Sequence, residues 1–499
     1  MSKDTFYRDT FVLTISNLAM GVLRFMFSII LSRQLGPEGV GLYGLIMPIY
    51  DLFTCLVCGG LVAALSKEAS AYYGTNHWGN LNKSVNVSFI FTLVWSIIVT
   101  VVIFLISPLV SNYIIKDTRS LYSLWIICPA LIFIALSSVF KGYYYGVSEV
   151  ITPAVIDIVE KAVRMALMIG IINYFALKDI KLTVAATYFS FTVGEFISFI
   201  FLYLFYKLSK RKFIGCEKKT ESRPQLLFNV LIMAIPLAIN GFLTTAIQSV
   251  STLVVPRRLV TAGFDYVTSL ELIGKFNGMA LAIVYFPVVI AVSMATILTP
   301  DISKSITQKD YDNVEIRVSE VIKMCFLLGV STVLICTIIP DSLGKLFFNR
   351  MDLGPYIKIA SLSAPFLYSS ICTYGILNGL GKQKAILINS IVTSILQLIF
   401  IFVLVGIPKI NILGYGIAML ISSIVGVILN IYEISKVVKF KTSLGEILIT
   451  LFLTILIGFF ISFLNGVLPN EIFLLKNIII ILTGLSLFII SIVLTKKSS

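Results

Sequence analysis

The chain has 499 residues, of which 58% are hydrophobic and 13% charged, and its mean hydropathy is +0.98. A soluble domain carries about 25% charged residues, so this composition excludes a water-soluble protein and indicates an integral membrane protein. The formal net charge of +14 does not indicate a nucleic-acid partner, because the positive side chains stand mainly in short loops between apolar runs, where they orient helices.

Apolar runs follow one another along the whole chain, and each has about the twenty residues that a helix needs to cross a bilayer. We expect an all-α membrane protein of about fourteen transmembrane helices. The runs are 10–32, 40–65, 84–106, 121–141, 154–175, 183–206, 225–254, 269–298, 316–339, 356–379, 385–405, 411–433, 444–464 and 472–494.

The loops alternate in positive charge. Those on the side of both termini hold twenty-one lysines and arginines, and those on the opposite side hold ten. Positive loops stay in the cytoplasm, so we expect a multi-pass protein of the cell membrane with both termini cytoplasmic.

The chain also repeats itself. A GxxxG pair, Gly142 and Gly146, closes the fourth span, and another, Gly375 and Gly379, closes the tenth. The second pair follows the first by 233 positions. The Ser-Lys pairs that close the second and eighth runs, at 66–67 and 303–304, are 237 apart. Six runs per half predict two bundles in a parallel pseudo-twofold repeat, which suits alternating access. The expected parts are a bundle at 1–207, a basic cytoplasmic linker at 208–224, a second bundle at 225–434 and two further helices at 435–499.

Ionisable residues lie inside several runs, where each costs at least about 2.5–3.5 kcal/mol to insert. Two spacings of four residues predict the helical ion pairs Asp157–Lys161 and Glu160–Arg164, and a third predicts Glu271–Lys275. Such pairs could neutralise each other and only fix helix register. The residues inside runs that we take as candidates are Arg24, Asp51, Asp157, Glu160, Lys161, Arg164, Glu195, Glu271 and Lys275.

Arg24 is the exception, because the sequence offers it no local partner. It must face a wet cavity or an acid from elsewhere in the chain. An arginine in a cavity indicates an anionic ligand, since its planar fork binds two phosphate oxygens and stays ionised. Prolines inside runs are expected to kink helices and free backbone carbonyls, as transporters often need, or to be tolerated kinks without function; they are Pro48, Pro129, Pro236, Pro287 and Pro365.

Several segments resemble a known family. The segment 32–43, SRQLGPEGVGLY, resembles the first-to-second-helix segment of polysaccharide transporters in the multidrug/oligosaccharidyl-lipid/polysaccharide (MOP) exporter superfamily. The segments 137–143 (SSVFKGY), 160–164 (EKAVR), 194–195 (GE) and 299–303 (TPDIS) are similar to its stage V sporulation protein B branch.

This resemblance implies a flippase for undecaprenyl-diphosphate-linked sugars, with peptidoglycan precursor for spore cortex or cell wall as the expected cargo. Lipid II flippases of the same superfamily resemble the chain in carrying a cavity arginine in the first helix, the position of Arg24. Their further cavity arginines in the second and eighth helices are replaced here by Asp51 and Lys275, which leaves the substrate open.

The resulting hypothesis assigns Arg24, Arg164 and Lys275 to the anionic headgroup. Asp51, Glu160, Lys161, Glu195 and Glu271 are then charge partners or coupling-ion sites. We expect no cofactor and no catalytic residue, with coupling to sodium, protons or the membrane potential left open. The expected partners are the lipid-linked anionic sugar, the bilayer and cell-wall synthesis enzymes, with no nucleic acid. The alternatives are an ion-coupled multidrug exporter, a membrane glycosyltransferase and a non-transporting cell-wall scaffold.

Overall fold

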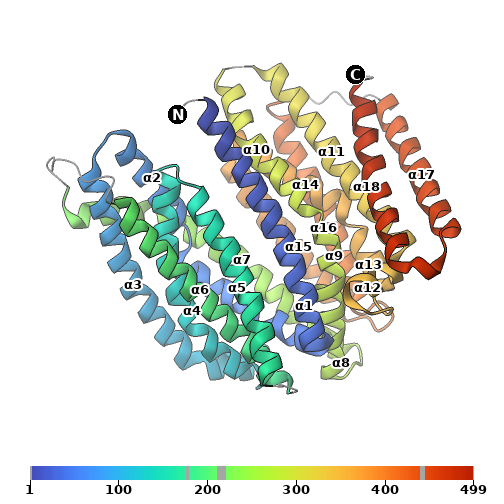
Figure 1. Cartoon of the computed structure of the whole chain (residues 1–499), viewed down its shortest axis with the longest axis horizontal. Helices are drawn as coiled ribbons and strands as arrows, with labels where there is room; N and C mark the ends of the chain where they lie inside the picture. The colour runs from blue at the N-terminus through green and yellow to red at the C-terminus, as the bar shows by residue number, and fades with distance from the viewer. Residues whose placement is uncertain (1–2, 176–178, 211–220, 309, 439–443, 498–499) are drawn as a thin grey trace. The chain divides into compact units, whose positions relative to one another are not determined.

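The computed structural model describes residues 3–175, 179–210, 221–308, 310–438 and 444–497. Side chains are described throughout these ranges except at 3–13, 444–451, 453, 470, 486–497 and the single positions 304, 307 and 313. Every element in the described ranges is a helix, the arrangement that satisfies backbone polar groups within a bilayer (Figure 1).

The chain divides into two compact units. The first contains Met1–Leu23 and Gln34–Leu253, and the second contains Arg24–Arg33 and Val254–Ser499. The first unit holds most of α1 (Lys3–Cys58), α2 (Leu61–Gly74), α3 (Trp78–Leu109), the π-helix η1 (Val110–Ile115), α4 (Ser120–Gly146), α5 (Ile151–Tyr174), α6 (Ile180–Lys210) and most of α7 (Arg223–Thr261).

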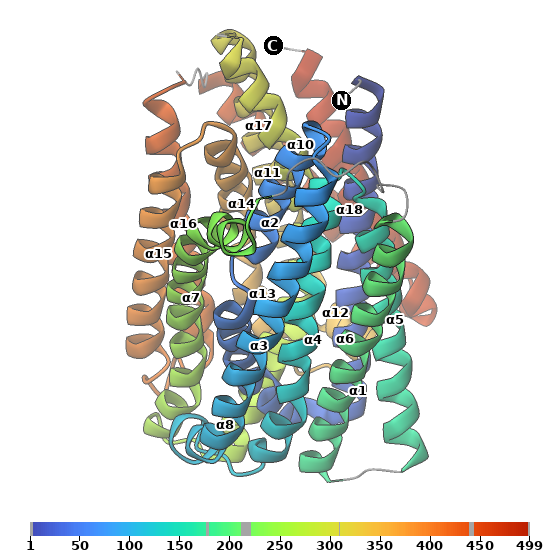
Figure 2. The same cartoon turned by 90° about the vertical axis from the view of Figure 1, so that its left-hand side faces the viewer.

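The second unit begins with a broken helix, α8 (Tyr266–Ile273), the π-helix η3 (Gly274–Ala280), α9 (Leu281–Tyr285) and α10 (Val288–Thr307). The helices that follow are α11 (Tyr311–Ile338), α12 (Pro340–Phe348), α13 (Gly354–Ser361), α14 (Ala364–Gly379), α15 (Gln383–Leu404), α16 (Leu413–Ser435), α17 (Leu444–Val467), η4 (Asn470–Ile472) and α18 (Phe473–Lys497). Figure 2 shows α15 and α16 running side by side.

Each predicted run falls on helix, but not always on one helix. By length and composition, nine helices of the described part can cross a membrane, and the first extends over Thr14–Gly74. That segment contains two predicted spans, divided where Gly36 leaves the helical conformation with φ 66° and ψ 178°. The chain is a multi-pass membrane protein, and the count of fourteen spans stays a prediction.

Two of the predicted prolines separate helices. Pro287 falls between α9 and α10, and Pro365 lies in the first turn of α14, just after α13 ends. The eighth and tenth predicted spans are therefore built from several helices each, because proline cannot donate the backbone hydrogen bond that would continue the preceding turn.

The GxxxG glycines bring equivalent helices together in both units. In the first unit, a Cβ on Gly146 would lie 2.8 Å from the carbonyl oxygen of Ser66 in α2. In the second unit, a Cβ on Gly379 would lie 2.7 Å from the carbonyl oxygen of Thr299 in α10. Ser66 and Thr299 are also 233 positions apart, the same separation as between the glycines. Both partners of the contact therefore repeat with one separation, which differs from the 237 positions between the Ser-Lys pairs.

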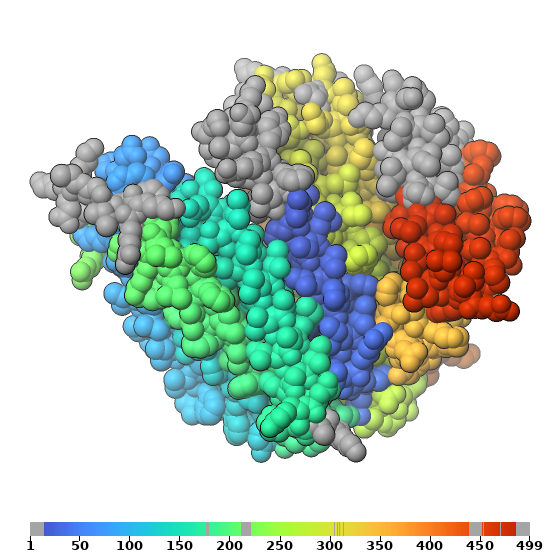
Figure 3. Space-filling view, in the orientation of Figure 1, coloured from blue at the N-terminus to red at the C-terminus, as the bar shows by residue number. Residues whose placement is uncertain are grey.

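The last two helices pack outside this repeat, against α11 of the second unit. Ser331 Oγ in α11 donates a hydrogen bond to the Gly484 carbonyl oxygen in α18 at 3.0 Å, and Gly458 in α17 faces Leu334. Figure 3 shows the described side chains of α17 and α18 in red. Apolar residues of both helices are exposed, among them Phe459 and Leu474. The proposed boundaries 225–434 and 435–499 place these two helices in a part of their own.

Candidate functional site

The charged face of α5 forms the largest buried ionic network among the described residues of the first unit. Arg164 Nη2 donates to Glu160 Oε1 one turn earlier, which confirms the predicted pair, and to Glu195 Oε1 of α6 at 3.3 Å. The side chains of Glu160, Arg164 and Glu195 are only 3%, 9% and 11% exposed. One guanidinium therefore contacts two carboxylates, and Lys161 supplies the second positive charge of the network, at a depth where an uncompensated charge is strongly destabilising.

Aromatic and small residues fit around this network. The guanidinium of Arg164 lies 3.7 Å from the centre of the Phe191 ring, a cation–π contact, and Tyr50 meets Phe191 edge-on. Gly194, the residue before Glu195, leaves space for the acid of α5, because a Cβ there would lie 2.7 Å from Glu160 Oε1. The Nε of Arg164 is buried without a hydrogen-bond partner.

The predicted Asp157–Lys161 pair is wrong. Lys161 Nζ binds Glu160 Oε2 at 2.6 Å, and Asp157 Oδ1 binds Lys141 Nζ of α4 at 2.7 Å. A neighbouring helix supplies a cation to Asp157, so the local i,i+4 partner is not used. Lys141 was not identified from the sequence as the partner of Asp157. The signal that was available is its position directly before Gly142, the first glycine of a close-packed GxxxG pair.

Lys275 lies in the second unit, in the π-helix η3, and the predicted Glu271–Lys275 pair is also wrong. Lys275 Nζ binds Asp352 Oδ2 at 2.8 Å, and Asp352 also receives the guanidinium of Arg350. The wider π-helical turn removes the α-helical i,i+4 alignment on which the prediction depended. Sequence reasoning missed Arg350 and Asp352, since both lie in the short loop between α12 and α13, far from Lys275 in the chain.

Arg24 is exposed on α1 and makes no ion pair with any residue that the structure describes. Its neighbours hold this part of α1 in the second unit: Phe25 packs on Phe286 and Phe347 with ring centres 4.8 and 4.9 Å away. Ser28 Oγ donates to the Gly278 carbonyl oxygen at 2.6 Å. The structure thus assigns Arg24 and Lys275 to one unit and Arg164 to the other.

Asp51 is the other predicted site residue that stands alone. It is exposed on the part of α1 that belongs to the first unit, and the described residues form no ion pair with it. Asp51 therefore does not join the Arg164 network. Glu271 forms no ion pair with Lys275, but its charge lies near Arg350 and, after the hydrogen bond that Arg350 donates to Asp352, adds to the rise in the pKa of that arginine.

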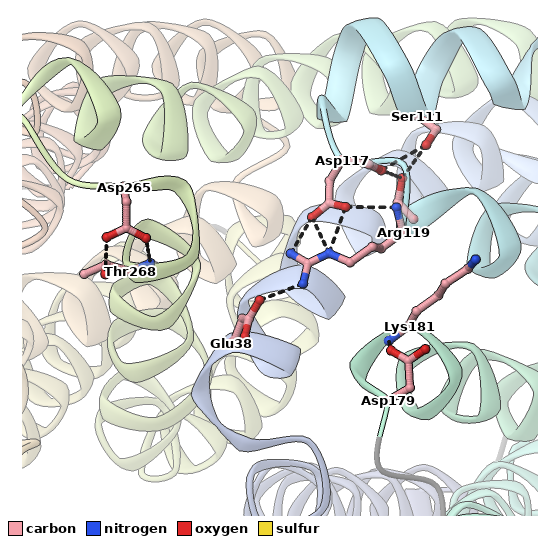
Figure 4. A network of polar contacts seen from close by, with 9 residues as sticks. Glu38, Ser111, Asp117, Arg119, Asp179, Lys181, Asp265 and Thr268 are labelled. Carbon is pink, nitrogen blue, oxygen red and sulfur yellow. Dashed lines mark hydrogen bonds and ion pairs between the residues drawn. The ribbon is translucent and has the colours of Figure 1, made fainter.

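A third ionic cluster was not predicted, and it holds the segment that follows Gly36. Arg119 donates to both oxygens of Asp117, from Nε to Oδ1 and from Nη2 to Oδ2, and to Glu38 Oε1 from Nη1 at 2.7 Å (Figure 4). The hydrogen bond to Asp117 raises the pKa of Arg119 above its usual value. Ser111 Oγ completes the cluster by donating to the Asp117 carbonyl oxygen at 3.0 Å.

Figure 4 also shows how α8 begins in the second unit. The Asp265 carboxylate caps the helix by accepting a hydrogen bond from the Thr268 backbone N–H at 3.0 Å. The hydrogen bond from the Thr268 side chain, and after it the bond from the Thr268 backbone N–H, lowers the pKa of Asp265.

Comparisons with known proteins agree with this architecture. The chain is 27% identical to Stage V sporulation protein B of Bacillus subtilis (strain 168) over 470 residues, which is 93% of this chain and 90% of that protein. It is 21% identical to Lipid II flippase MurJ of the same organism over 79% of this chain and 76% of that protein.

Solved structures show the same fold at low identity. A structure of lipid II flippase MurJ in an inward closed conformation matches with a TM-score of 0.71, 13% identity and 99% coverage of both chains. An inward-facing multidrug resistance MATE family transporter of the MOP superfamily matches with a TM-score of 0.63 and 14% identity, over 85% of this chain and 98% of that chain.

The family model described as polysaccharide biosynthesis protein matches residues 6–264 and 279–444, which is most of the chain. The fold, the membrane-spanning helices and the relatives are those of transport proteins rather than enzymes. The chain belongs to the polysaccharide biosynthesis protein family.

Proposed function

We propose that this protein is a flippase that moves a lipid-linked anionic oligosaccharide across the cell membrane by alternating access. The proposed cargo is an undecaprenyl-diphosphate sugar, a peptidoglycan precursor for spore cortex or cell wall. The observation that carries the proposal is Arg24, a permanently charged side chain that is exposed within an apolar helix and unpaired among the described residues. The family match and the relatives named for sporulation and for lipid II flipping support the same cargo class.

The three proposed headgroup cations differ in availability. Arg164 and Lys275 each contact a carboxylate, so an anionic headgroup must compete with an internal partner for either of them. Arg24 has no such competitor among the described side chains. Arg24 is therefore the proposed first contact of the diphosphate, and Arg164 and Lys275 are contacts made as the protein changes conformation.

The remaining charged residues support this role. Glu160 and Glu195 keep Arg164 oriented and neutralised, and Lys161 balances the charge of Glu160. Asp51 and Glu271 are proposed as coupling-ion or charge-partner positions. Both termini are proposed to lie in the cytoplasm, with cell-wall synthesis enzymes as partners. No bond is made or broken, so the turnover rate is set by conformational exchange.

Flipping of a fluorescent undecaprenyl-diphosphate sugar in proteoliposomes tests the proposal. Arg24→Ala is expected to reduce flipping to the rate of protein-free vesicles, while Arg24→Lys keeps part of it because the charge remains. Arg33→Ala is the matched control, since Arg33 is an exposed arginine on the same helix. Wild-type flipping by purified Arg24→Ala at equal protein content would overturn the role of Arg24.

The exposed carboxylate of Asp51 favours one other candidate, an ion-coupled exporter of cationic drugs. Such a transporter needs an accessible acid that binds a cation and exchanges it for a proton or sodium. Expression in a drug-sensitised host separates the two functions: an exporter raises resistance in an Asp51-dependent manner, and a flippase leaves resistance unchanged.

A further inference from the structure

The loop between α12 and α13 carries two opposite charges, Arg350 and Asp352, and its backbone is closely packed. Asn349 ends α12 in the left-handed conformation with φ 56°, and the Arg350 N–H donates to the Gly344 carbonyl oxygen at 3.2 Å. A Cβ on Gly344 would lie 2.6 Å from the Arg350 carbonyl oxygen, so only glycine permits this approach. The loop therefore presents both charged side chains from a fixed position.

Asp352 holds two cations at once. Its Oδ1 accepts from Arg350 Nε at 2.8 Å, and its Oδ2 accepts from Arg350 Nη2 at 2.7 Å and from Lys275 Nζ at 2.8 Å. Hydrogen bonding from Arg350, followed by that from Lys275, lowers the pKa of Asp352, which stays ionised at neutral pH. The Asp352 side chain is 43% exposed, whereas that of Lys275 is 16% exposed.

This geometry is also that of a phosphate site. A planar guanidinium that meets two oxygens side by side, with an ammonium on one of them, binds phosphate as well as carboxylate. Because Asp352 is the most exposed member and Arg350 is 31% exposed, an anion from solution can approach the two cations as the carboxylate withdraws. A diphosphate brings more charge than a carboxylate, and this favours the exchange.

We infer that Lys275 and Arg350 form a diphosphate-binding site whose resting occupant is the Asp352 carboxylate, so that Asp352 sets how strongly an anion must bind to enter. The inference rests on the proposed function, in which Lys275 is a headgroup cation, and it adds Arg350 as a second cation and Asp352 as a built-in competitor. The shared ligand chemistry is the diphosphate group, whether lipid-linked or free.

Calorimetric titration of the protein in nanodiscs with inorganic pyrophosphate tests this inference. Asp352→Asn is expected to strengthen binding roughly fivefold, the size that two partly exposed ion pairs allow. Lys275→Gln added to Asp352→Asn is expected to remove the gain, and so is Arg350→Gln. Asp352→Glu keeps the carboxylate and is expected to bind pyrophosphate as the wild type does.

Asp117→Asn is the matched control, because Asp117 binds Arg119 with the same two-oxygen geometry in the first unit. Unchanged pyrophosphate binding in Asp352→Asn, with a melting temperature equal to that of the wild type, overturns the inference. Arg119 keeps its ion pair with Glu38 in this variant, so no gain is expected. An equal gain in Asp117→Asn overturns the inference too, since removing any carboxylate beside an arginine would then suffice.

The same variants separate this inference from the proposed function. If the wild type does not flip an undecaprenyl-diphosphate sugar but Asp352→Asn binds pyrophosphate more tightly, the anion site stands and the flippase function fails. If the wild type flips the lipid and Asp352→Asn shows no gain, the function stands and the competitor role of Asp352 fails. A third outcome is that Asp352→Asn changes the rate of lipid flipping but does not strengthen pyrophosphate binding. That outcome also counts against a site that recognises the diphosphate alone.

Discussion

The α4–α6 helices of the first unit and the α14–α16 helices of the second occupy equivalent places in the repeat, yet their buried polar groups differ. In the first unit, Arg164 lies between Glu160 and Glu195. In the second, Asn389 Nδ2 donates to Asn430 Oδ1 at 2.9 Å, and Asn430 Nδ2 donates to Thr373 Oγ1 at 3.0 Å. One network is ionic, and the other is made of uncharged amides and a hydroxyl.

The difference shows that the repeat keeps its glycine contacts but not its buried polar residues. The glycine contacts recur in one register, so the two units share this helix contact. Thr393 lies 233 positions after Glu160 and contributes only a hydroxyl that bonds within its own helix. Because charges in a bilayer cost more than amides, the ionic network of the first unit is the better candidate for a role beyond packing.

The largest expected effect comes from breaking the ionic network. Arg164→Ala leaves Glu160 and Glu195 buried without their shared cation, and is expected to lower the free energy of unfolding by about 3–5 kcal/mol. Unfolding in bicelles with increasing denaturing detergent measures this loss. Adding Glu160→Gln to Arg164→Ala is expected to restore part of the stability, because one buried negative charge is removed. Additive losses in the double variant would contradict a shared network.

A smaller effect tests the helix contact that the two units share. Gly146→Ala and Gly379→Ala each place a methyl group against a backbone carbonyl oxygen of the neighbouring helix, and each is expected to cost about 1–3 kcal/mol. The same unfolding assay measures both. Gly170→Ala is the control, since a Cβ at Gly170 meets nothing within 4 Å. Markedly unequal losses at 146 and 379 would mean that the two contacts are not equivalent.

The smallest effect is expected in the amide network. Asn430→Ala removes both side-chain hydrogen bonds to Asn389 and Thr373, and buried hydrogen bonds between membrane helices contribute about 0.6 kcal/mol on average. The expected loss is therefore about 1 kcal/mol, with Asn389→Ala costing less because it removes only the bond to Asn430. A loss as large as that of Arg164→Ala would remove the distinction between the two networks.

The helices of the chain were predictable from the sequence because apolar length alone specifies them. The predicted run 385–405 became α15 (Gln383–Leu404) almost unchanged. The run 269–298 became four elements, since Gly274, Gly278 and Pro287 weaken or interrupt a helix that hydropathy treats as continuous. The division of α1 between units, at Arg24 and again after Arg33, has no sequence signal of this kind.

The candidate site was predictable where partners are local and not where they are distant. Glu160–Arg164 follows from a spacing of four on one helix, and the structure forms it. Lys275 binds an acid 77 positions away, and Arg119 binds Glu38 across 81 positions. Such pairs depend on how helices pack, which a single sequence does not specify. The basic linker predicted at 208–224 lies partly outside the described residues, at 211–220.

The contact between Ser28 and Gly278 spans 250 positions, and it joins one of the first helices to be synthesised to a segment made much later. At usual translation rates of about 5–20 residues per second, the first helix remains in the membrane for roughly 10–50 s before this partner emerges from the ribosome. Until then, the contacts that Phe25 and Ser28 make in the second unit cannot form. The order of synthesis therefore requires the first helix, with Arg24 in it, to stay in the bilayer before any of these contacts exists.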